Sequence, residues 1–119
     1  MIDRGIEQLI KGAPVVGLTD TLRRAASLVR ASDGSRILVI SNGAILGTVS
    51  ERAITAALAQ AEDGEAILDS KVESLMEPGI VFLNHGSTLR GAAATFAAND
   101  VDVLPVIDNF GSYRGVLYR

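Results

Sequence analysis

The chain has 119 residues, enough for one ordinary domain or two very small ones. Hydrophobic residues make up 48% of it and charged residues 21%, which excludes a disordered tail. Cysteine is absent and His85 is the single histidine, so disulfides, thiol nucleophiles and thiolate or polyhistidine metal sites are excluded. The formal net charge of −3 argues against a general nucleic-acid binder, which needs a basic face to displace counterions.

No segment predicts export or membrane insertion. The N-terminus carries Asp3 and Arg4 early and has no long apolar run behind it. No stretch reaches the roughly 18 uncharged apolar residues that a membrane span requires. We therefore expect a soluble cytoplasmic protein, with neither nucleic acid nor a membrane as a partner.

An internal repeat is the most informative feature, because it indicates two copies of one structural unit. Residues 21–26 (TLRRAA) recur as residues 88–93 (TLRGAA), and residues 37–40 (ILVI) recur as residues 104–107 (LPVI). The remaining correspondences are Gly47-Thr48-Val49 with Gly115-Val116-Leu117, and Ile6, Leu9 and Ile10 with Val72, Leu75 and Met76.

In chain order, the repeated unit predicts a helix, a strand, a second helix, two further strands and, in the first copy, a final helix. Apolar residues spaced i, i+3, i+4 and i+7 predict helices over residues 21–31 and 88–98. Asn42-Gly43 is a strong hairpin signal between two β-rich runs. The alanine-rich residues 51–61 predict the final helix of the first copy. The N-cap candidates are Asp20 or Thr21 and Ser87 or Thr88, and the expected strands are 14–16, 36–41, 44–50, 80–83, 103–108 and 114–118.

The predicted domain organisation follows from the repeat. Residues 1–61 form repeat one with an N-terminal helix, the acidic residues 62–70 form a linker, and residues 71–119 form repeat two without its final helix. We expect either a fragment of a longer protein or a naturally open second copy. The predicted fold is mixed α/β (α+β), with two βαββα-type units packed sheet to sheet about a pseudo-twofold axis and two equivalent clefts between them.

An ordered set of motifs, present twice, resembles the CBS domain family, named for cystathionine β-synthase, in the tandem arrangement called a Bateman module. The resemblance covers nearly the whole chain. The segments that carry it are Val72-x-x-Leu75-Met76, residues 83–93, Val103-Leu104-Pro105-Val106-Ile107-Asp108 and Gly47-Thr48-Val49-Ser50-Glu51-Arg52.

The resemblance implies regulatory binding of adenosine-containing ligands, such as AMP, ADP, ATP or S-adenosylmethionine, in the clefts between the copies. It also implies that a Gly-x-x-Ser/Thr-x-x-Asp motif anchors the ribose through a hydroxyl and a carboxylate. This sequence departs from that motif, because Ala53 stands at the aspartate position of the first copy and Tyr118 at the hydroxyl position of the second. No cofactor is required by this interpretation.

The two expected clefts differ in the groups that they keep. The better candidate for an adenine nucleotide combines a retained hydroxyl, a helix N-terminus and an arginine. Its residues are Asn84, His85, Asp102, Val103, Leu104, Gly47, Ser50, Glu51 and Arg52. The second, degenerate cleft comprises Leu18, Thr19, Ser35, Arg36, Ile37, Tyr118 and Arg119.

Each of these candidates also has a plain structural interpretation. In that interpretation Ser50 is simply a helix cap, His85 is a turn residue, and Arg36 and Arg52 are solvated cations. Residues 62–65 are acidic but are interpreted as a solvated linker, and no metal site is expected. No catalytic motif is recognisable, so we expect no enzyme.

Two functions remain open at this stage. The first is an adenosine-ligand sensor that is part of, or a partner to, a larger regulated protein. The second is a ligand-free dimerisation or interaction module with degenerate nucleotide sites. We expect a homodimer in either case, because exposed apolar helix faces need a cover, and the resemblance implies flat, disc-like dimers.

Overall fold

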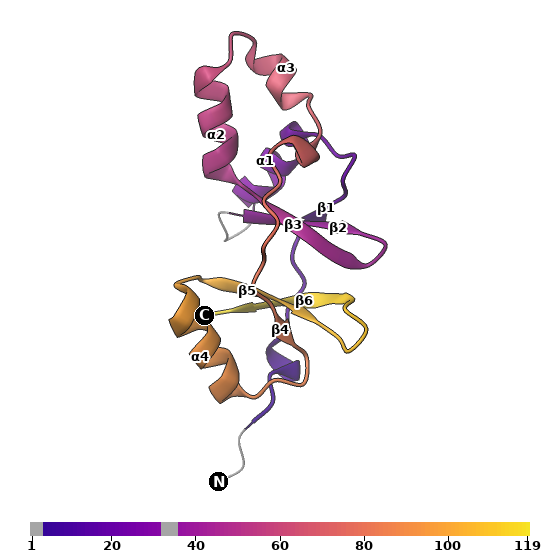
Figure 1. Ribbon diagram of the computed structural model, residues 1–119, viewed down its shortest axis with the longest axis vertical. Coiled ribbons are helices and arrows are strands. Elements are labelled where there is room, and N and C mark those ends of the chain that lie inside the picture. Colours follow the sequence, from indigo (N-terminus) through magenta and orange to yellow (C-terminus); the bar gives the residue numbers. More distant parts are fainter. Residues whose placement is uncertain (1–3, 32–35) are drawn as a thin grey trace. The chain divides into compact units, whose positions relative to one another are not determined.

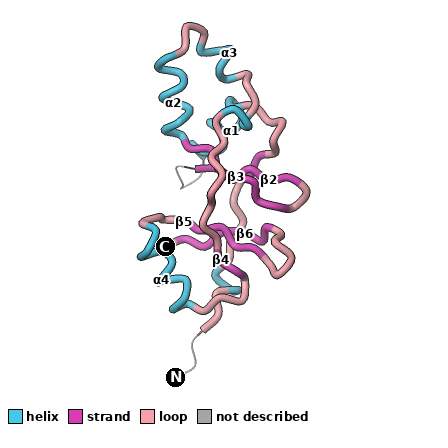
Figure 2. The backbone as a smooth tube through the Cα atoms, viewed as in Figure 1, coloured by secondary structure: helices cyan, strands magenta, loops and turns pink. Residues whose placement is uncertain are grey.

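Two compact units make up the protein in the computed structural model, which describes residues 4–31 and 36–119. The first unit is Pro14–Ile80, and the second combines the N-terminal segment up to Ala13 with Val81–Arg119. Each unit contains a three-stranded sheet and accompanying helices (Figures 1 and 2). The mixed α/β fold with two repeated units is therefore confirmed.

The first unit has the sheet order β1-β2-β3, with β1 parallel and β3 antiparallel to the central strand. Its strands are β1 (Val15–Val16), β2 (Arg36–Ser41) and β3 (Ala44–Ser50). Its helices are α1 (Leu22–Ala31), α2 (Glu51–Gln60), α3 (Gly64–Leu68) and the 3-10 turn η2 (Val72–Ser74).

The second unit repeats this pattern with the sheet order β4-β5-β6. Its strands are β4 (Leu83–Asn84), β5 (Val103–Ile107) and β6 (Tyr113–Tyr118). Its helices are the 3-10 turn η1 (Glu7–Leu9) and α4 (Leu89–Asn99).

Local sequence explains where these elements begin and turn. The Oγ1 of Thr21 accepts a hydrogen bond from the amide of Arg24 at 3.2 Å, and Thr88 caps α4 in the same way through Gly91 at 3.1 Å. Asn42 and Gly43 both have positive φ, 52° and 80°, which is the tight turn that the Asn-Gly pair predicts.

Each sheet contributes to a hydrophobic core of its own. In the first unit, α1 buries one face against the apolar residues of β2 and β3, and α2 adds Ile54. In the second unit, α4 buries Ala92 and Phe96 against β5 and β6, while Leu89 is only half-buried. The buried members are Val16, Leu22, Ala25, Ala26, Val29, Ile37, Val39, Val49, Ile54 and Val72 in one core, and Ile6, Leu83, Ala92, Phe96, Leu104, Val106 and Leu117 in the other.

The segment that begins each repeat packs against the other repeat's sheet. Residues 70–77 join the first unit, where the amide of Leu22 donates to Ser70 O and Glu77 pairs with Thr48 in both directions at 2.8 and 2.9 Å. Residues 4–11 make the equivalent bonds in the second unit. There the amide of Leu89 donates to Arg4 O, and Lys11 pairs with Val116 at 2.9 and 2.8 Å. Residues 4–11 thus pack with the sheet of the second repeat and residues 70–77 with the sheet of the first. We call these two segments the exchanged segments.

Three expectations from the sequence need correction. The helices expected before the first strands are single 3-10 turns, because only three residues in each adopt that conformation. The strand expected over residues 80–83 is β4, which begins at Leu83 and leaves Val81 and Phe82 exposed. The expected linker 62–70 contains α3, because Asp63 caps it through the amides of Glu65 and Ala66.

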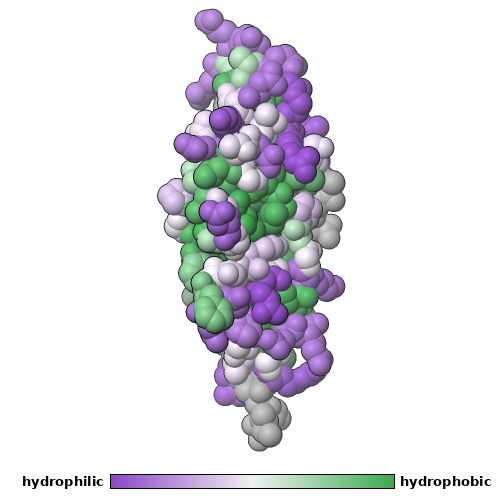
Figure 3. All heavy atoms as spheres, turned by 90° about the vertical axis from the view of Figure 1, so that its right-hand side faces the viewer, coloured by the Kyte–Doolittle hydropathy of each residue, from purple (hydrophilic) through white to green (hydrophobic). Residues whose placement is uncertain are grey.

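Apolar side chains also reach the surface. Figure 3 shows hydrophobic areas beside hydrophilic ones on one face of the molecule. Among the large apolar residues, Phe110 is 92% exposed at the β5–β6 turn, and Leu9, Phe82 and Tyr118 are also exposed. In the described part of the chain, no helix is both long and apolar enough to cross a membrane.

Candidate functional site

The junction between β3 and α2 is built around Ser50. This residue is only 7% exposed, and its Oγ accepts a hydrogen bond from the amide of Ala53 at 3.0 Å. The bond satisfies one of the free amides at the helix start, so Ser50 is the N-cap of α2. Gly47, three residues earlier, is buried against Met76 and Glu77 and is closed to a ligand from that side.

The first turn of α2 exposes one acidic and one basic side chain. Glu51 and Arg52 are both exposed, and no acidic side chain within the described ranges forms an ion pair with Arg52. A helix N-terminus carries a partial positive charge, which makes an arginine unfavourable there unless an anion accompanies it. Backbone amides and a guanidinium together are groups that bind a phosphate.

The start of β2 lies at the same end of the first sheet, because Arg36 pairs with Ser50 across the strands. The Nη1 of Arg36 lies 3.3 Å from Thr48 Oγ1 and 3.1 Å from Glu77 Oε2, so its charge is already matched. Ile37 is buried. Ser35, predicted beside them, lies outside the described residues.

Leu18 and Thr19 lie at the opposite end of that sheet. They follow β1, which runs parallel to β2 with Val16 opposite Val39, so the chain leaves β1 near the carboxyl end of β2. Ile40, near the carboxyl end of β2, stands four positions after Arg36, roughly 13 Å away along an extended strand. The structure therefore does not bring Leu18 and Thr19 together with Arg36 and Ile37 within this unit.

The second sheet repeats this arrangement. Val103 pairs with Tyr118, and the amide of Arg119 donates to Asp102 O at 2.8 Å, so these residues share one end. Leu104 is buried and Val103 half-buried, while the Arg119 guanidinium lies 3.9 Å from an Asp102 carboxylate oxygen.

Asn84 and His85 occupy the other end of the second sheet. Asn84 pairs with Ile107, and the amide of His85 donates to Ile107 O at 2.8 Å. Val103 begins the same strand four residues earlier, again roughly 13 Å away. The Asn84 side chain is already hydrogen-bonded, since it donates to Asn109 Oδ1 at 3.1 Å and accepts from the amide of Gly86.

His85 is held by a residue from the N-terminal segment. Its Nδ1 lies 2.7 Å from Glu7 Oε1. This hydrogen bond, together with the charge of the imidazole, lowers the pKa of the Glu7 carboxyl. Asp108 lies close enough to feel the charges of His85 and Arg114, but hydrogen bonds from the amides of Ser112 and Phe110 are the main reason that its pKa is lowered, with the Ser112 bond the largest contribution.

Sequence analysis did not identify these local partners. Glu7 stands 78 positions from His85, and Glu77 stands 41 from Arg36, so no periodic pattern connects them. Both acids lie in the exchanged segments, but the repeat equates Glu7 with Glu73 and not with Glu77, so it does not reveal these contacts. Tyr113 was also missed: its hydroxyl is buried without a hydrogen bond in the described part of the chain, and burial raises its pKa.

The candidate residues therefore fall into four groups. In the first unit, Gly47, Ser50, Glu51 and Arg52 adjoin Arg36 and Ile37, with Leu18 and Thr19 at the far end. In the second, Asp102, Val103 and Leu104 adjoin Tyr118 and Arg119, with Asn84 and His85 at the far end. Among the described residues, no group of three or more histidines or carboxylates is arranged to hold a metal ion.

Solved structures with the same fold place this chain among known architectures. A protein of Methanocaldococcus jannaschii, described as a proposed archaeal homologue of g-AMPK, is 19% identical with a TM-score of 0.83, covering 98% of this chain and 45% of that one. A CBS domain pair/ACT domain protein of Thermotoga maritima is 19% identical with a TM-score of 0.78, covering 96% and 88%. CbpB in complex with c-di-AMP is 18% identical with a TM-score of 0.79, covering 97% and 79%.

Sequence comparison assigns the family directly. The chain spans less than half the length of the archaeal protein, and comparison with curated proteins gives no match. The model of the CBS domain family, however, matches residues 6–60 and again residues 72–119, nearly the whole chain in two segments. The chain belongs to the CBS domain family and consists of a pair of CBS domains.

Proposed function

We propose that this CBS domain pair is a regulatory module that binds an adenosine-containing ligand, such as AMP, ADP or ATP, and acts as part of, or partner to, a larger protein. The observation that carries the proposal is the β3–α2 junction, where the capped helix start carries Arg52 without an acidic partner among the described residues. An anion at this point would relieve the unfavourable placement of the guanidinium at the helix N-terminus.

Two of the similar structures suggest which ligands to test. One was solved in complex with c-di-AMP, and the other is described by its likeness to g-AMPK. Their identity to this chain is below one fifth, so they support the fold alone and leave the ligand as a proposal. We therefore include c-di-AMP beside AMP, ADP and ATP in the ligand class to be tested.

Each proposed group has a defined role. The Arg52 guanidinium and the amides of Glu51 and Arg52 bind phosphate oxygens, while Ser50 lies beside the ribose. Asp102, Val103 and Leu104, which the family resemblance assigns to the adenine, stand at or just before the start of β5. Ala53 supplies no carboxylate for the ribose hydroxyls, so the proposed binding is weak and discriminates poorly between ribose and deoxyribose.

Support for Asn84 and His85 as ligand residues is weaker. They lie at the opposite end of β5 from Val103 and hold Asn109 and Glu7 respectively. The proposal therefore depends on Ser50 and Arg52, not on these two side chains.

Titration calorimetry with AMP, ADP, ATP and c-di-AMP at up to millimolar concentration tests the proposal. We expect saturable heat from at least one ligand. The same ligand should give weaker binding to Arg52→Gln and unchanged binding to Arg30→Gln, which removes an exposed arginine from α1 instead. Absence of binding by all four ligands would overturn the proposal.

A ligand-free dimerisation or interaction module is the second candidate function. Ala53 and Tyr118 occupy the two positions where ribose-binding groups are expected, and several large apolar residues, including Phe110 and Phe82, are exposed. This function is favoured if no adenine nucleotide binds to the parent chain or to Ala53→Asp, a variant that restores the carboxylate.

A further inference from the structure

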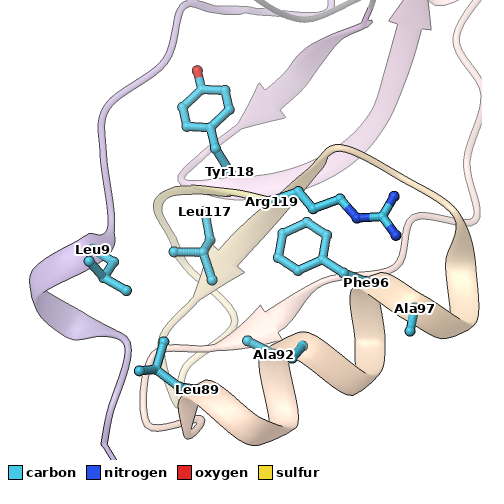
Figure 4. Close-up of a pocket in the computed structure, with 9 residues that line it drawn as sticks. Leu9, Leu89, Ala92, Phe96, Ala97, Leu117, Tyr118 and Arg119 are labelled. Atoms are coloured by element: carbon cyan, nitrogen blue, oxygen red, sulfur yellow. The ribbon is translucent and has the colours of Figure 1, made fainter.

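Residues 4–11 are held in the second unit by backbone hydrogen bonds and by apolar contacts. Lys11 pairs with Val116 in both directions, at 2.9 and 2.8 Å. Ile6 is completely buried in the core of this unit. Leu9 lines an apolar pocket that α4 and the end of β6 also line (Figure 4). Contacts of these two kinds contain no group that titrates near neutral pH.

One contact between side chains also joins this segment to the second unit. Glu7 Oε1 lies 2.7 Å from His85 Nδ1, and 24% of the His85 side chain is exposed. Histidine is the side chain that ordinarily gains or loses its proton between about pH 5 and pH 8. A protonated imidazole donates a charge-assisted hydrogen bond to a carboxylate, which is roughly twice as strong as the bond from a neutral ring. The contact therefore strengthens as the ring takes up its proton.

Two other charged groups act on this pair. Asp108, at the end of β5, and Arg114, on β6, lie close enough for their charges to reach it. A hydrogen bond with His85 lowers the pKa of Glu7, and hydrogen bonds from backbone amides, that of Ser112 first, lower the pKa of Asp108. Both carboxyl groups therefore stay ionised from about pH 8 to pH 5.5. Within this cluster, the charge that changes over that range is the charge of His85.

The other exchanged segment is held by a different kind of ion pair. In residues 70–77, Glu77 Oε2 lies 3.1 Å from Arg36 Nη1, and arginine keeps its charge at any pH near neutrality. The repeat and the strand pairing place Leu18 at the position of His85, so the first unit has no imidazole there. A titrating contact is thus present on one exchanged segment and is replaced by a permanent charge on the other.

We propose that the Glu7–His85 contact is a pH-sensitive clamp, which holds residues 4–11 more tightly as the pH falls from about 8 to 5.5 while the hold on residues 70–77 stays constant. A contact that favours the protonated ring contributes stability at the lower pH, and that contribution is lost as the pH rises. The Glu7 side chain is 63% exposed, so the effect is of the size found for exposed ion pairs. The inference does not depend on nucleotide binding.

Amide hydrogen exchange of the full chain, measured by NMR at pH 5.5 and pH 7.5, tests the clamp. Each rate is divided by the intrinsic exchange rate at the same pH. The amides of Ile6 and Lys11 report on residues 4–11, and the amides of Leu22 and Glu77 report on residues 70–77. We expect the protection of the first pair relative to the second to be about 1.5- to 5-fold higher at pH 5.5. An equal ratio at the two pH values, or a higher ratio at pH 7.5, would overturn the proposal.

Two variants assign the effect to the imidazole. His85→Asn keeps a neutral hydrogen-bond donor beside Glu7 but takes up no proton, so the pH dependence of the Lys11 amide should disappear. Arg36→Gln is the matched control in the first unit, because it breaks the equivalent ion pair without removing a titrating group. It should lower the protection of the Glu77 amide by the same factor at both pH values. If His85→Asn keeps the pH dependence of the parent, another group is responsible and the proposal is wrong.

A double-mutant cycle measures the contact itself. Glu7→Gln, His85→Asn and the variant with both substitutions are compared with the parent at the same two pH values. We expect the coupling between the two positions, expressed as the change in opening equilibrium of the Lys11 amide, to be larger at pH 5.5 than at pH 7.5. Unchanged protection of the Leu22 amide shows that the first unit remains folded in every variant. A coupling that is the same at both pH values contradicts the proposal.

Discussion

Gly47 and Met76 lie so close that a Cβ atom added to Gly47 would stand 2.6 Å from Met76 Cγ. The same Cβ would stand 2.6 Å from Glu77 O, which is fixed by its hydrogen bond from Thr48. Glycine at this position is therefore explained by contact with the exchanged segment. Gly115 has the same relation to Ile10 and Lys11 in the second unit, also at 2.6 Å, and its φ is +144°.

Gly47→Ala should destabilise the protein by about 1–3 kcal/mol, because the methyl group forces residues 76–77 away from β3. Urea unfolding followed by circular dichroism measures this change. Gly12→Ala is the control, since a Cβ there meets nothing within 4 Å, and it should leave stability unchanged or slightly higher. Equal stability of Gly47→Ala and the parent would contradict the packing described for residues 70–77.

Ser50→Ala should cost about 1 kcal/mol of unfolding free energy, because the amide of Ala53 loses its acceptor and the start of α2 loses its cap. Thermal and chemical denaturation both measure the loss. Ser50→Asp keeps an acceptor oxygen at the same place and should recover most of the stability. If Ser50→Asp is as unstable as Ser50→Ala, the side chain has a role other than capping.

Ala53→Asp should tighten binding of AMP or ATP, on the assumption that the proposed site is correct. A restored carboxylate adds a charge-assisted hydrogen bond worth roughly 1.5–3 kcal/mol, which corresponds to about one to two decades of affinity. Discrimination against the deoxyribose form should increase in parallel. Calorimetry on both proteins with ATP and dATP makes the comparison, and an absence of heat from both proteins would favour the interaction module.

Glu7→Gln should lower stability near pH 5.5, and the difference from the parent should shrink as the pH falls below 4.5. The folded pKa of Glu7 lies below its ordinary value of 4.5, because His85 hydrogen-bonds its carboxylate. The contribution is therefore complete above that ordinary value and is lost as the pH falls through the lowered folded pKa. Glu73→Gln is the matched control, since Glu73 occupies the equivalent position of η2 and forms no ion pair within the described ranges. A difference for Glu7→Gln that does not shrink as the pH falls below 4.5 would contradict this role.

The protein should be a homodimer at tens of micromolar concentration, because exposed apolar helix surface is usually covered by association. Multi-angle light scattering gives the mass directly. A mass of 12.5 kDa, that of a single chain, would contradict this prediction.

Local signals account for most of the elements that were predicted correctly. The i, i+3, i+4 spacing and the threonine caps place α1 and α4 within a residue of their observed starts, and Asn42-Gly43 fixes the first hairpin. The exchange of residues 4–11 and 70–77 could not be predicted, because backbone pairing such as Lys11 with Val116 leaves no periodic trace in the sequence. The five residues of α3 are too few for a hydrophobic period to show.

The candidate site was predictable to a similar degree. The cap at Ser50 follows from sequence alone, because a serine before an alanine-rich run is a common helix start. The separation of His85 from Val103 does not, because it depends on the parallel pairing of β4 with β5, and a parallel partner is not marked by a tight turn.

The pairing of residues 4–11 with β6 and the start of α4 has a consequence for synthesis on the ribosome. Chains emerge N-terminus first, and the first unit, Pro14–Ile80, is one continuous stretch that can be completed as soon as it has emerged. Residues 4–11 precede that unit in the chain but cannot pack at the same time. The backbone hydrogen bonds of Lys11 are made with Val116, which is synthesised 105 positions later. Residues 4–11 are thus made before the first unit but are packed after it.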